Sequence, residues 1–97
     1  MTHQLVSFDH KVQIAGHVLL EEIEDEAILL HIEKEEYFAL DDVGTQMLNT
    51  LKASDSIQAA YDQLLNIYQV EPTTLRQDLL DYVQQLHQDG LIEVLTP

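Results

Sequence analysis

The sequence predicts an α+β fold in which three antiparallel strands are followed by three helices. Apolar residues between positions 17 and 40 come in short clusters of the strand type, whereas beyond Leu40 they repeat with a helical period of about 3.6 residues. Separate blocks of strands and helices pack with the helices on one face of the sheet, so another face or edge stays available. At 97 residues, the chain is long enough for a single domain.

The three predicted strands are the apolar runs Val18–Leu20, Ala27–Ile32 and Tyr37–Leu40. Their short length and their content of branched and aromatic side chains favour strands over helices. The separators, residues 24–26 and 33–36, are short and polar, as in the connections of a meander, although they lack Gly, Asn and Pro. Neighbours on a strand face opposite ways, so we expect the rings of Tyr37 and Phe38 on opposite faces of the sheet.

Three stripes of apolar residues at helical spacing predict the three helices. The first helix begins at Asp41 or Asp42, the second at Ser54 or Ser56, and the third near Pro72, with its end at Gly90. The stripe residues, in chain order, are Val43, Met47, Leu48 and Leu51; Ile57, Tyr61, Leu64, Leu65 and Tyr68; and Leu75, Leu79, Tyr82, Val83 and Leu86.

The two ends of the chain are predicted to lie outside the main block of three strands and three helices. Residues 1–16 are expected to form an arm or an extra strand, and residues 17–97 the domain itself. Leu91–Leu95 is expected as a short terminal strand. Gly44 falls in the first turn of a predicted helix, which indicates close packing against the sheet.

The charge of the chain excludes several classes of partner. Asp and Glu outnumber Lys and Arg by 18 to 4, which gives a formal net charge of −14. Nucleic acid and anionic membranes both require clustered basic residues, and here they are scattered as Lys11, Lys34, Lys52 and Arg76. The N-terminus has no basic segment followed by a long apolar run, so we expect no signal peptide, no membrane span and a cytoplasmic location.

No residue pattern predicts catalysis, a metal site or a cofactor. The absence of Cys excludes disulfides, thiolate metal sites and Cys nucleophiles. His3, His10, His17 and His31 are spaced too widely for the usual pairs of metal ligands, so we expect surface histidines, with His31 facing solvent. The many carboxylates single out no acid/base pair, and the three glycines form no phosphate loop. An aromatic on the last strand and Tyr82 on the last helix would instead line a groove suited to a peptide.

Seven short segments occur in an order and spacing that resemble the PqqD-like family, the leader-peptide recognition elements of ribosomally made, modified peptides. The resemblance covers roughly residues 17–95. Its segments are Ile28-Leu29-Leu30, Tyr37-Phe38-Ala39-Leu40-Asp41, Val43-Gly44, Val70-Glu71-Pro72, Arg76, Asp78-Leu79 and Gly90-Leu91-Ile92.

The resemblance implies a winged-helix-like domain without enzymatic activity. Such a domain binds the leader segment of a precursor peptide and presents the rest to a modifying enzyme. The leader is expected to add as a strand along the third strand, in the groove toward the third helix. Arg76 would then meet an acidic leader residue, and Asp78 or Glu36 a basic one. The expected peptide-binding residues are Glu36, Tyr37, Phe38, Ala39, Leu40, Leu75, Arg76, Asp78, Leu79, Tyr82 and Val83.

The form Tyr-Phe-x-Leu-Asp-x-x-Gly at residues 37–44 is similar to the stand-alone elements of lasso-peptide pathways, whose partner enzyme is a separate leader peptidase. Three features depart from the family. Glu35 stands near a turn position that usually carries Gly, Glu71 stands where Asp is common, and the chain has no Trp.

Two other functions stay open at the level of the sequence. Asp55-Ser56-Ile57 resembles the attachment site of acyl carrier proteins, in which Ser56 would carry a phosphopantetheine arm. A helix cap explains the same serine, and acyl carrier proteins are all-helical, so we favour the cap. The second alternative is an acidic winged-helix regulator.

Overall fold

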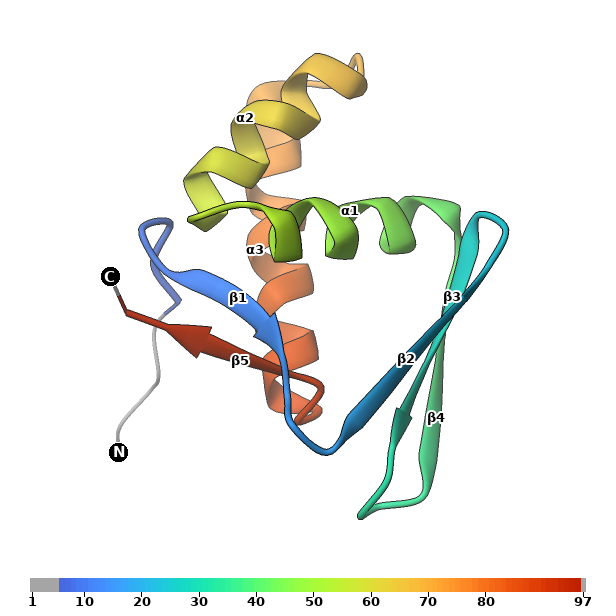
Figure 1. Ribbon diagram of the computed structural model, residues 1–97. Helices are drawn as coiled ribbons and strands as arrows, with labels where there is room; N and C mark the ends of the chain where they lie inside the picture. The colour runs from blue at the N-terminus through green and yellow to red at the C-terminus, as the bar shows by residue number, and fades with distance from the viewer. Residues whose placement is uncertain (1–5, 97) are drawn as a thin grey trace.

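Five strands and three helices are present in residues 6–96, the part of the chain that the computed structural model describes (Figure 1). His3, predicted as a surface residue, lies outside this part. No helix within it combines the length and the apolar character needed to cross a bilayer. The elements are β1 (Lys11–Ile14), β2 (Val18–Ile23), β3 (Glu26–His31), β4 (Glu36–Leu40), α1 (Asp42–Ala53), α2 (Ile57–Ile67), α3 (Pro72–Gln88) and β5 (Ile92–Leu95).

Strands β2, β3 and β4 form one antiparallel sheet with β3 in the centre. The helices follow this sheet in the chain, which confirms the predicted α+β fold and is compatible with a winged-helix-like domain. β1 and β5 pair in a separate antiparallel ribbon. β5 confirms the predicted terminal strand, and β1 falls in the segment for which the sequence left an arm or a strand open. The division of the chain at residue 17 stays a prediction.

One face of the β2-β3-β4 sheet is buried beneath the helices. Its inward positions on β3 are Ala27, Leu29 and His31, which are 2%, 0% and 3% exposed. The prediction that His31 faces solvent is therefore wrong. Apolar residues occupy both faces of this strand, so the alternation that separates inside from outside cannot be read from its sequence.

The helices supply most of the core through the predicted stripes. Leu48, Leu51, Ile57, Leu64, Leu79 and Val83 are at most 1% exposed. Val43 is an exception at 43% exposure, so its predicted place on the inner stripe is wrong. The reason is a surface hollow between α1 and the start of α3, which Val43 lines together with Met47 and Leu75.

The helix starts follow the predicted caps. The carboxylate of Asp41 accepts a hydrogen bond from the N–H of Gly44 at 2.8 Å, and the hydroxyl of Ser56 accepts one from Ala59 at 3.0 Å. These bonds confirm Asp41 and Ser56 as the caps of α1 and α2. Glu71 precedes α3 without a side-chain cap bond, and Pro72 takes the first helical position.

The turns of the sheet hold two glutamates in a backbone region that favours glycine. Glu24 and Glu35 have φ angles of 58° and 54°. This region costs a residue with a Cβ about 1–2 kcal/mol, whereas the greater freedom of an unfolded glycine costs about 0.5–1 kcal/mol. Glu35→Gly is therefore expected to raise the free energy of unfolding by about 0.5–1 kcal/mol, measured by urea denaturation.

A matched control for Glu35→Gly is Glu33→Gly, at a turn residue whose φ is not positive. Here no backbone strain is relieved, and the exposed contact of Glu33 with His17 is also lost, so this variant should be less stable than the parent chain. Equal destabilisation by the two substitutions would contradict the strain assigned to Glu35.

Candidate functional site

β4 is an edge strand whose outer side has no partner within residues 6–96. It pairs with β3, while β1 and β5 pair with each other in a ribbon that stands apart from this sheet (Figure 1). An unpaired edge presents backbone N–H and C=O groups to which another extended chain can add.

The register shows which backbone groups of β4 point outward. The N–H of Ile32 donates to the carbonyl of His17 at 3.1 Å, so this is a hydrogen-bonded pair of the β2-β3 ladder. Hydrogen bonds to the two neighbouring strands alternate along β3, so the next residue turns its bonds toward β4. The residues of β4 that bond inward are those opposite Ala27, Leu29 and His31, namely Leu40, Phe38 and Glu36. The N–H and C=O groups of Tyr37 and Ala39 therefore point to the free edge.

The side chains of β4 divide between the two faces of the sheet. Phe38 and Leu40 are half-buried and pack against the core, and Glu36 shares their face at the exposed start of the strand. Tyr37 is 74% exposed on the opposite face, beside Ala39. The prediction that the two rings lie on opposite faces is confirmed.

Two contacts place α3 alongside β4. At the end of β4, the Tyr82 hydroxyl donates to the carbonyl of Gly44 at 2.8 Å. At the other end, Gly90 lies so close to His31, which pairs with Glu36, that a Cβ on Gly90 would stand 3.2 Å from the imidazole Nε2. The last two turns of α3 therefore run antiparallel to β4, and the groove expected from the family resemblance would lie between them.

The close contact between Tyr82 and position 44 favours a glycine. A Cβ at position 44 would lie 3.3 Å from the Tyr82 hydroxyl and 3.6 Å from the Cβ of Leu40, so the predicted close packing involves both α3 and the sheet. Burial, and to a lesser degree the nearby Asp41 carboxylate, raises the pKa of Tyr82 to about 12. The hydroxyl therefore stays a hydrogen-bond donor at neutral pH.

The expected residues of α3 lie in two layers. Leu75, Leu79 and Val83 are 4%, 0% and 0% exposed, so they lie in the core beneath the groove. Asp78 is exposed and Tyr82 is half-buried on the side that faces Gly44. Gln85 and Asp89, which follow Tyr82 at helical spacing of three and seven residues, are joined by a hydrogen bond of 3.2 Å.

A hollow of about 230 Å³ lies between α1, the loop before α3 and the first turns of α3. Its lining is mostly apolar, with Thr74 and the exposed Asp78 as polar lining residues. The sequence analysis assigned Leu75 and Asp78 to the site and missed the other lining residues. No sequence pattern marks Val70, which is 46% exposed in the loop before α3. The remaining lining residues are Val43, Met47, Tyr68 and Leu75.

Arg76 lies away from the groove. Two residues along a helix correspond to about 200° of rotation, so Arg76 and Asp78 project from nearly opposite sides of α3. The Arg76 guanidinium stands over the Phe8 ring, 4.0 Å from its centroid, and Phe8 packs edge-on against Tyr61. This cation–π contact joins α3 to the segment before β1, which the sequence analysis had left without contacts.

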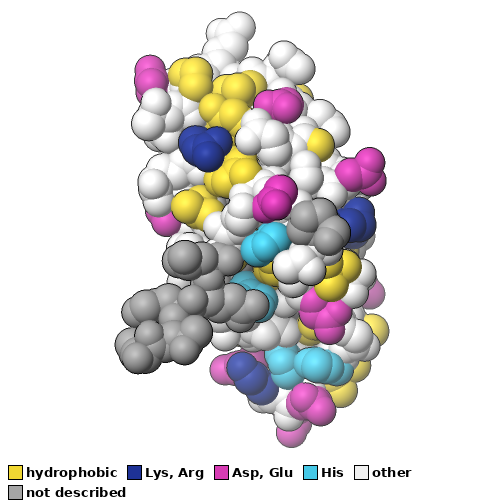
Figure 2. All heavy atoms as spheres, turned by 90° about the vertical axis from the view of Figure 1, so that its left-hand side faces the viewer, with side chains coloured by type: hydrophobic (Ala, Val, Ile, Leu, Met, Phe, Trp, Pro, Cys, Tyr) yellow, Lys and Arg dark blue, Asp and Glu magenta, His cyan; other side chains and the backbone are white. Residues whose placement is uncertain are grey.

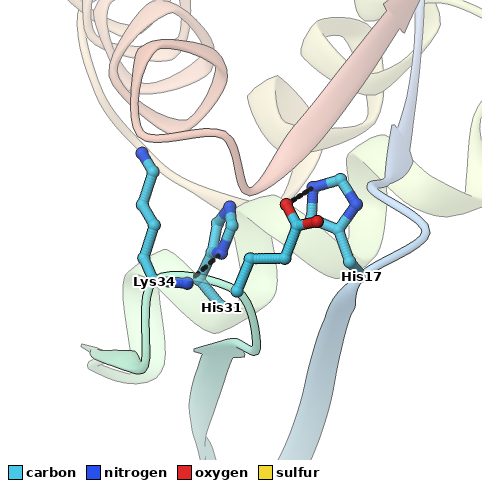
Figure 3. Close-up of polar contacts among 4 residues, drawn as sticks. His17, His31 and Lys34 are labelled. Carbon is cyan, nitrogen blue, oxygen red and sulfur yellow. Dashed lines mark hydrogen bonds and ion pairs between the residues drawn. The ribbon is translucent and has the colours of Figure 1, made fainter.

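His17 and His31 form a polar cluster with Glu33 and Lys34 beside the β3-β4 turn (Figure 3). The rings of His17 and His31 lie 5.0 Å apart, and His17 is 3.9 Å from the carboxylate of Glu33. The Nδ1 atom of His31 accepts a hydrogen bond of 3.2 Å from the backbone N–H of Lys34. In the described part of the chain, no group of three or more His, Asp and Glu side chains is placed to hold a metal ion.

Acidic side chains are spread over the face of the molecule shown in Figure 2, where the Lys and Arg side chains stand apart from one another. Lys11 donates to the carbonyl of Ser54 at 3.0 Å. The arrangement shows no basic patch on this face, as the scattered basic residues of the sequence predict.

Comparison with known families identifies the chain. Residues 26–92 match the family described as coenzyme PQQ synthesis protein D (PqqD). The chain belongs to the PqqD family. This confirms the resemblance found in the sequence, and it excludes the acyl carrier alternative together with the observed sheet. A search among curated proteins gives no match.

A solved structure resembles this PqqD-family chain closely. It is described as TbiB1 in complex with the TbiA(beta) leader peptide. The two chains share 31% sequence identity with a TM-score of 0.78, and the match covers 84% of this chain and 94% of that chain.

Proposed function

We propose that this PqqD-family chain binds the leader segment of a ribosomally made precursor peptide as an added strand on β4. The outward backbone groups of Tyr37 and Ala39 on the free edge of β4 are the observation that carries the proposal. The leader-peptide complex of TbiB1, whose chain is 31% identical, supports it. Strand addition supplies main-chain hydrogen bonds, and pockets for alternate side chains supply selectivity.

The groove suggests how the leader is selected. Every second side chain of an added strand turns toward α3, where it meets Phe38, Leu40 and Tyr82. A leader that continues past Leu40 reaches the hollow bordered by Asp78, which suits one apolar side chain. The exposed carboxylates of Glu36 and Asp78 favour a basic leader residue nearby. Arg76 is held by Phe8 and is assigned no role in binding.

We infer that the chain is a non-catalytic carrier and that a separate processing enzyme cleaves or modifies the bound precursor. The form Tyr-Phe-x-Leu-Asp-x-x-Gly at residues 37–44 supports a leader peptidase of a lasso-peptide pathway as that enzyme. Strand addition is consistent with one protein that binds and another that processes the precursor. It holds the leader by its backbone and leaves the following precursor residues free to enter another active site.

The test is a titration of the chain with the fluorescein-labelled leader of the precursor from the same pathway, followed by fluorescence anisotropy. We expect saturable binding that weakens with salt. The variant Asp78→Lys should bind a leader with Lys or Arg beside its apolar anchor more weakly, while Asp62→Lys, on α2, should bind as the parent chain does. A folded chain that shows no saturable binding, or that binds a scrambled peptide equally well, would contradict the proposal.

A further inference from the structure

A second hollow, of about 650 Å³, lies between the β2-β3 turn, one side of α1 and the end of α2. Four carboxylates line it, from Glu22, Glu24, Asp25 and Asp42, and none of its lining residues is Lys or Arg. All four acidic residues are exposed. The lining is therefore negative and holds no balancing cation. We call this surface the acidic hollow.

The hydroxyl of Thr45 is a buried polar group without a partner in this wall. Thr45 lines the acidic hollow from the start of α1 and is 5% exposed. Its Oγ1 atom makes no hydrogen bond with any of residues 6–96. Burial of a hydroxyl costs free energy unless a partner is supplied. The orphan hydroxyl therefore points to a ligand that brings hydrogen-bond donors into the hollow.

Other polar groups of the acidic hollow already have partners. The Asn49 amide donates to the Glu22 carboxylate at 2.9 Å, and the Tyr68 hydroxyl donates to the Oε1 atom of Gln46 at 2.6 Å. Burial, followed by the charge of Asp42, raises the pKa of Tyr68. Negative charge thus acts on the wall itself, and the unmet need of the hollow is for a positive charge with donors.

Size and composition select the kind of ligand. Within the described residues, no three acidic or histidine side chains are placed to hold a metal ion. Val43, Ala53 and Tyr68 add apolar surface beside the carboxylates. A Lys or Arg side chain suits both features, since it carries several N–H donors at the end of an apolar stem.

We propose that the acidic hollow binds a cationic group on an apolar stem, supplied by Lys or Arg residues that precede the strand-forming part of the leader. This source rests on the proposed function. The acidic hollow adjoins the hollow of about 230 Å³ at Val43 and Tyr68, which line both. Strands β2, β3 and β4 pair antiparallel, and a leader added to β4 in the same way has its N-terminal side at Leu40, close to Val43. A free polyamine has the same chemistry and is the alternative source.

The test uses two leaders of the same pathway, extended at the N-terminus by three Lys or by three Gln and labelled with fluorescein at the C-terminus. By anisotropy at low salt, the parent chain should bind the lysine leader about threefold to tenfold more tightly than the glutamine leader. The double variant Glu24→Gln/Asp25→Asn removes two carboxylates of the hollow and should lose most of this preference. Glu93→Gln/Asp62→Asn removes the same charge on β5 and α2, outside the hollow, and should keep it.

Thr45→Val tests the buried hydroxyl, because valine keeps the branched shape and removes the group that lacks a partner. The melting temperature should stay at or above that of the parent chain, whereas affinity for the lysine leader should fall about threefold. A purely structural role would lower the melting temperature and leave the preference for lysine over glutamine unchanged. Parent-like preference in this variant overturns the contact assigned to Thr45.

The remaining outcomes separate the acidic hollow from the proposed function. Equal loss of preference in both double variants, or no loss in either, overturns the hollow as a site while leader binding stands. Failure of both leaders to bind the parent chain contradicts the proposed function. Spermidine that then shifts the NMR amide signals of Glu24, Asp25 and Thr45 still supports the hollow. The same shifts beside equal affinity for the two leaders assign the hollow to a free polyamine and overturn the leader as its source.

Discussion

Ala39→Pro is expected to abolish leader binding while the domain stays folded. The N–H of Ala39 points to the free edge of β4, so proline removes a donor that only an added strand would use. Its ring also stands where that strand must approach. Proline is tolerated on an edge strand when the missing N–H faces solvent, so the bonds between β3 and β4 survive. We expect leader affinity to fall by at least about tenfold, measured by anisotropy.

Two control variants test the direction of the backbone groups. Ala39→Ser keeps the outward N–H, so its leader affinity should stay close to that of the parent chain. Phe38→Pro removes an inward N–H that bonds to β3, so it should destabilise the sheet, seen as an early melting transition by circular dichroism. Leader binding by a folded Ala39→Pro variant at the parent affinity would show that the peptide adds elsewhere.

Leu79→Asp is expected to unfold the chain. Leu79 is 0% exposed between Leu75 and Val83, and a carboxylate there would be buried without a partner. Removing the leucine side chain alone costs about 2–5 kcal/mol, which approaches the total stability of about 5–15 kcal/mol that is usual for a domain. Circular dichroism should show the loss of a cooperative thermal transition.

Asp78→Ala is the matched control for Leu79→Asp, because it changes the adjacent but exposed position on α3. Its melting temperature should stay close to that of the parent chain. Loss of leader binding in Leu79→Asp would then report unfolding rather than a missing contact in the groove. A parent-like thermal transition in Leu79→Asp would contradict the place given to this residue in the core.

Most of the fold was accessible from the sequence, because short apolar runs and helical stripes report local structure directly. The misplacement of His31 has a different origin. Its strand is apolar on both faces, since Ile28 and Leu30 point outward, and the pattern therefore holds no signal for the inward side. Val43 was misplaced because helical spacing shows which residues share a side and does not show whether another element covers that side.

The sequence predicted which segments form the candidate site, but it did not predict how their residues are oriented. The resemblance to the PqqD-like family pointed to β4 and α3, but the outward direction of Tyr37 and Ala39 depends on the register of the sheet. The hollow beyond β4 depends on the path of the loop between α2 and α3, which carries no periodic pattern. The contact of Arg76 depends on the segment before β1, which is far away in the sequence.

Gly44 has only a hydrogen atom as its side chain, and this leaves room for another residue beside the end of β4. It lets the Tyr82 hydroxyl approach the backbone at the junction of β4 and α1, which ties α3 to the end of the edge strand. An alanine in its place would force the Tyr82 hydroxyl or the Asp41 carboxylate to move by a few tenths of an ångström. A single methyl group would thus disturb the hydrogen bond that fixes Tyr82 near the strand edge where we propose that the peptide adds.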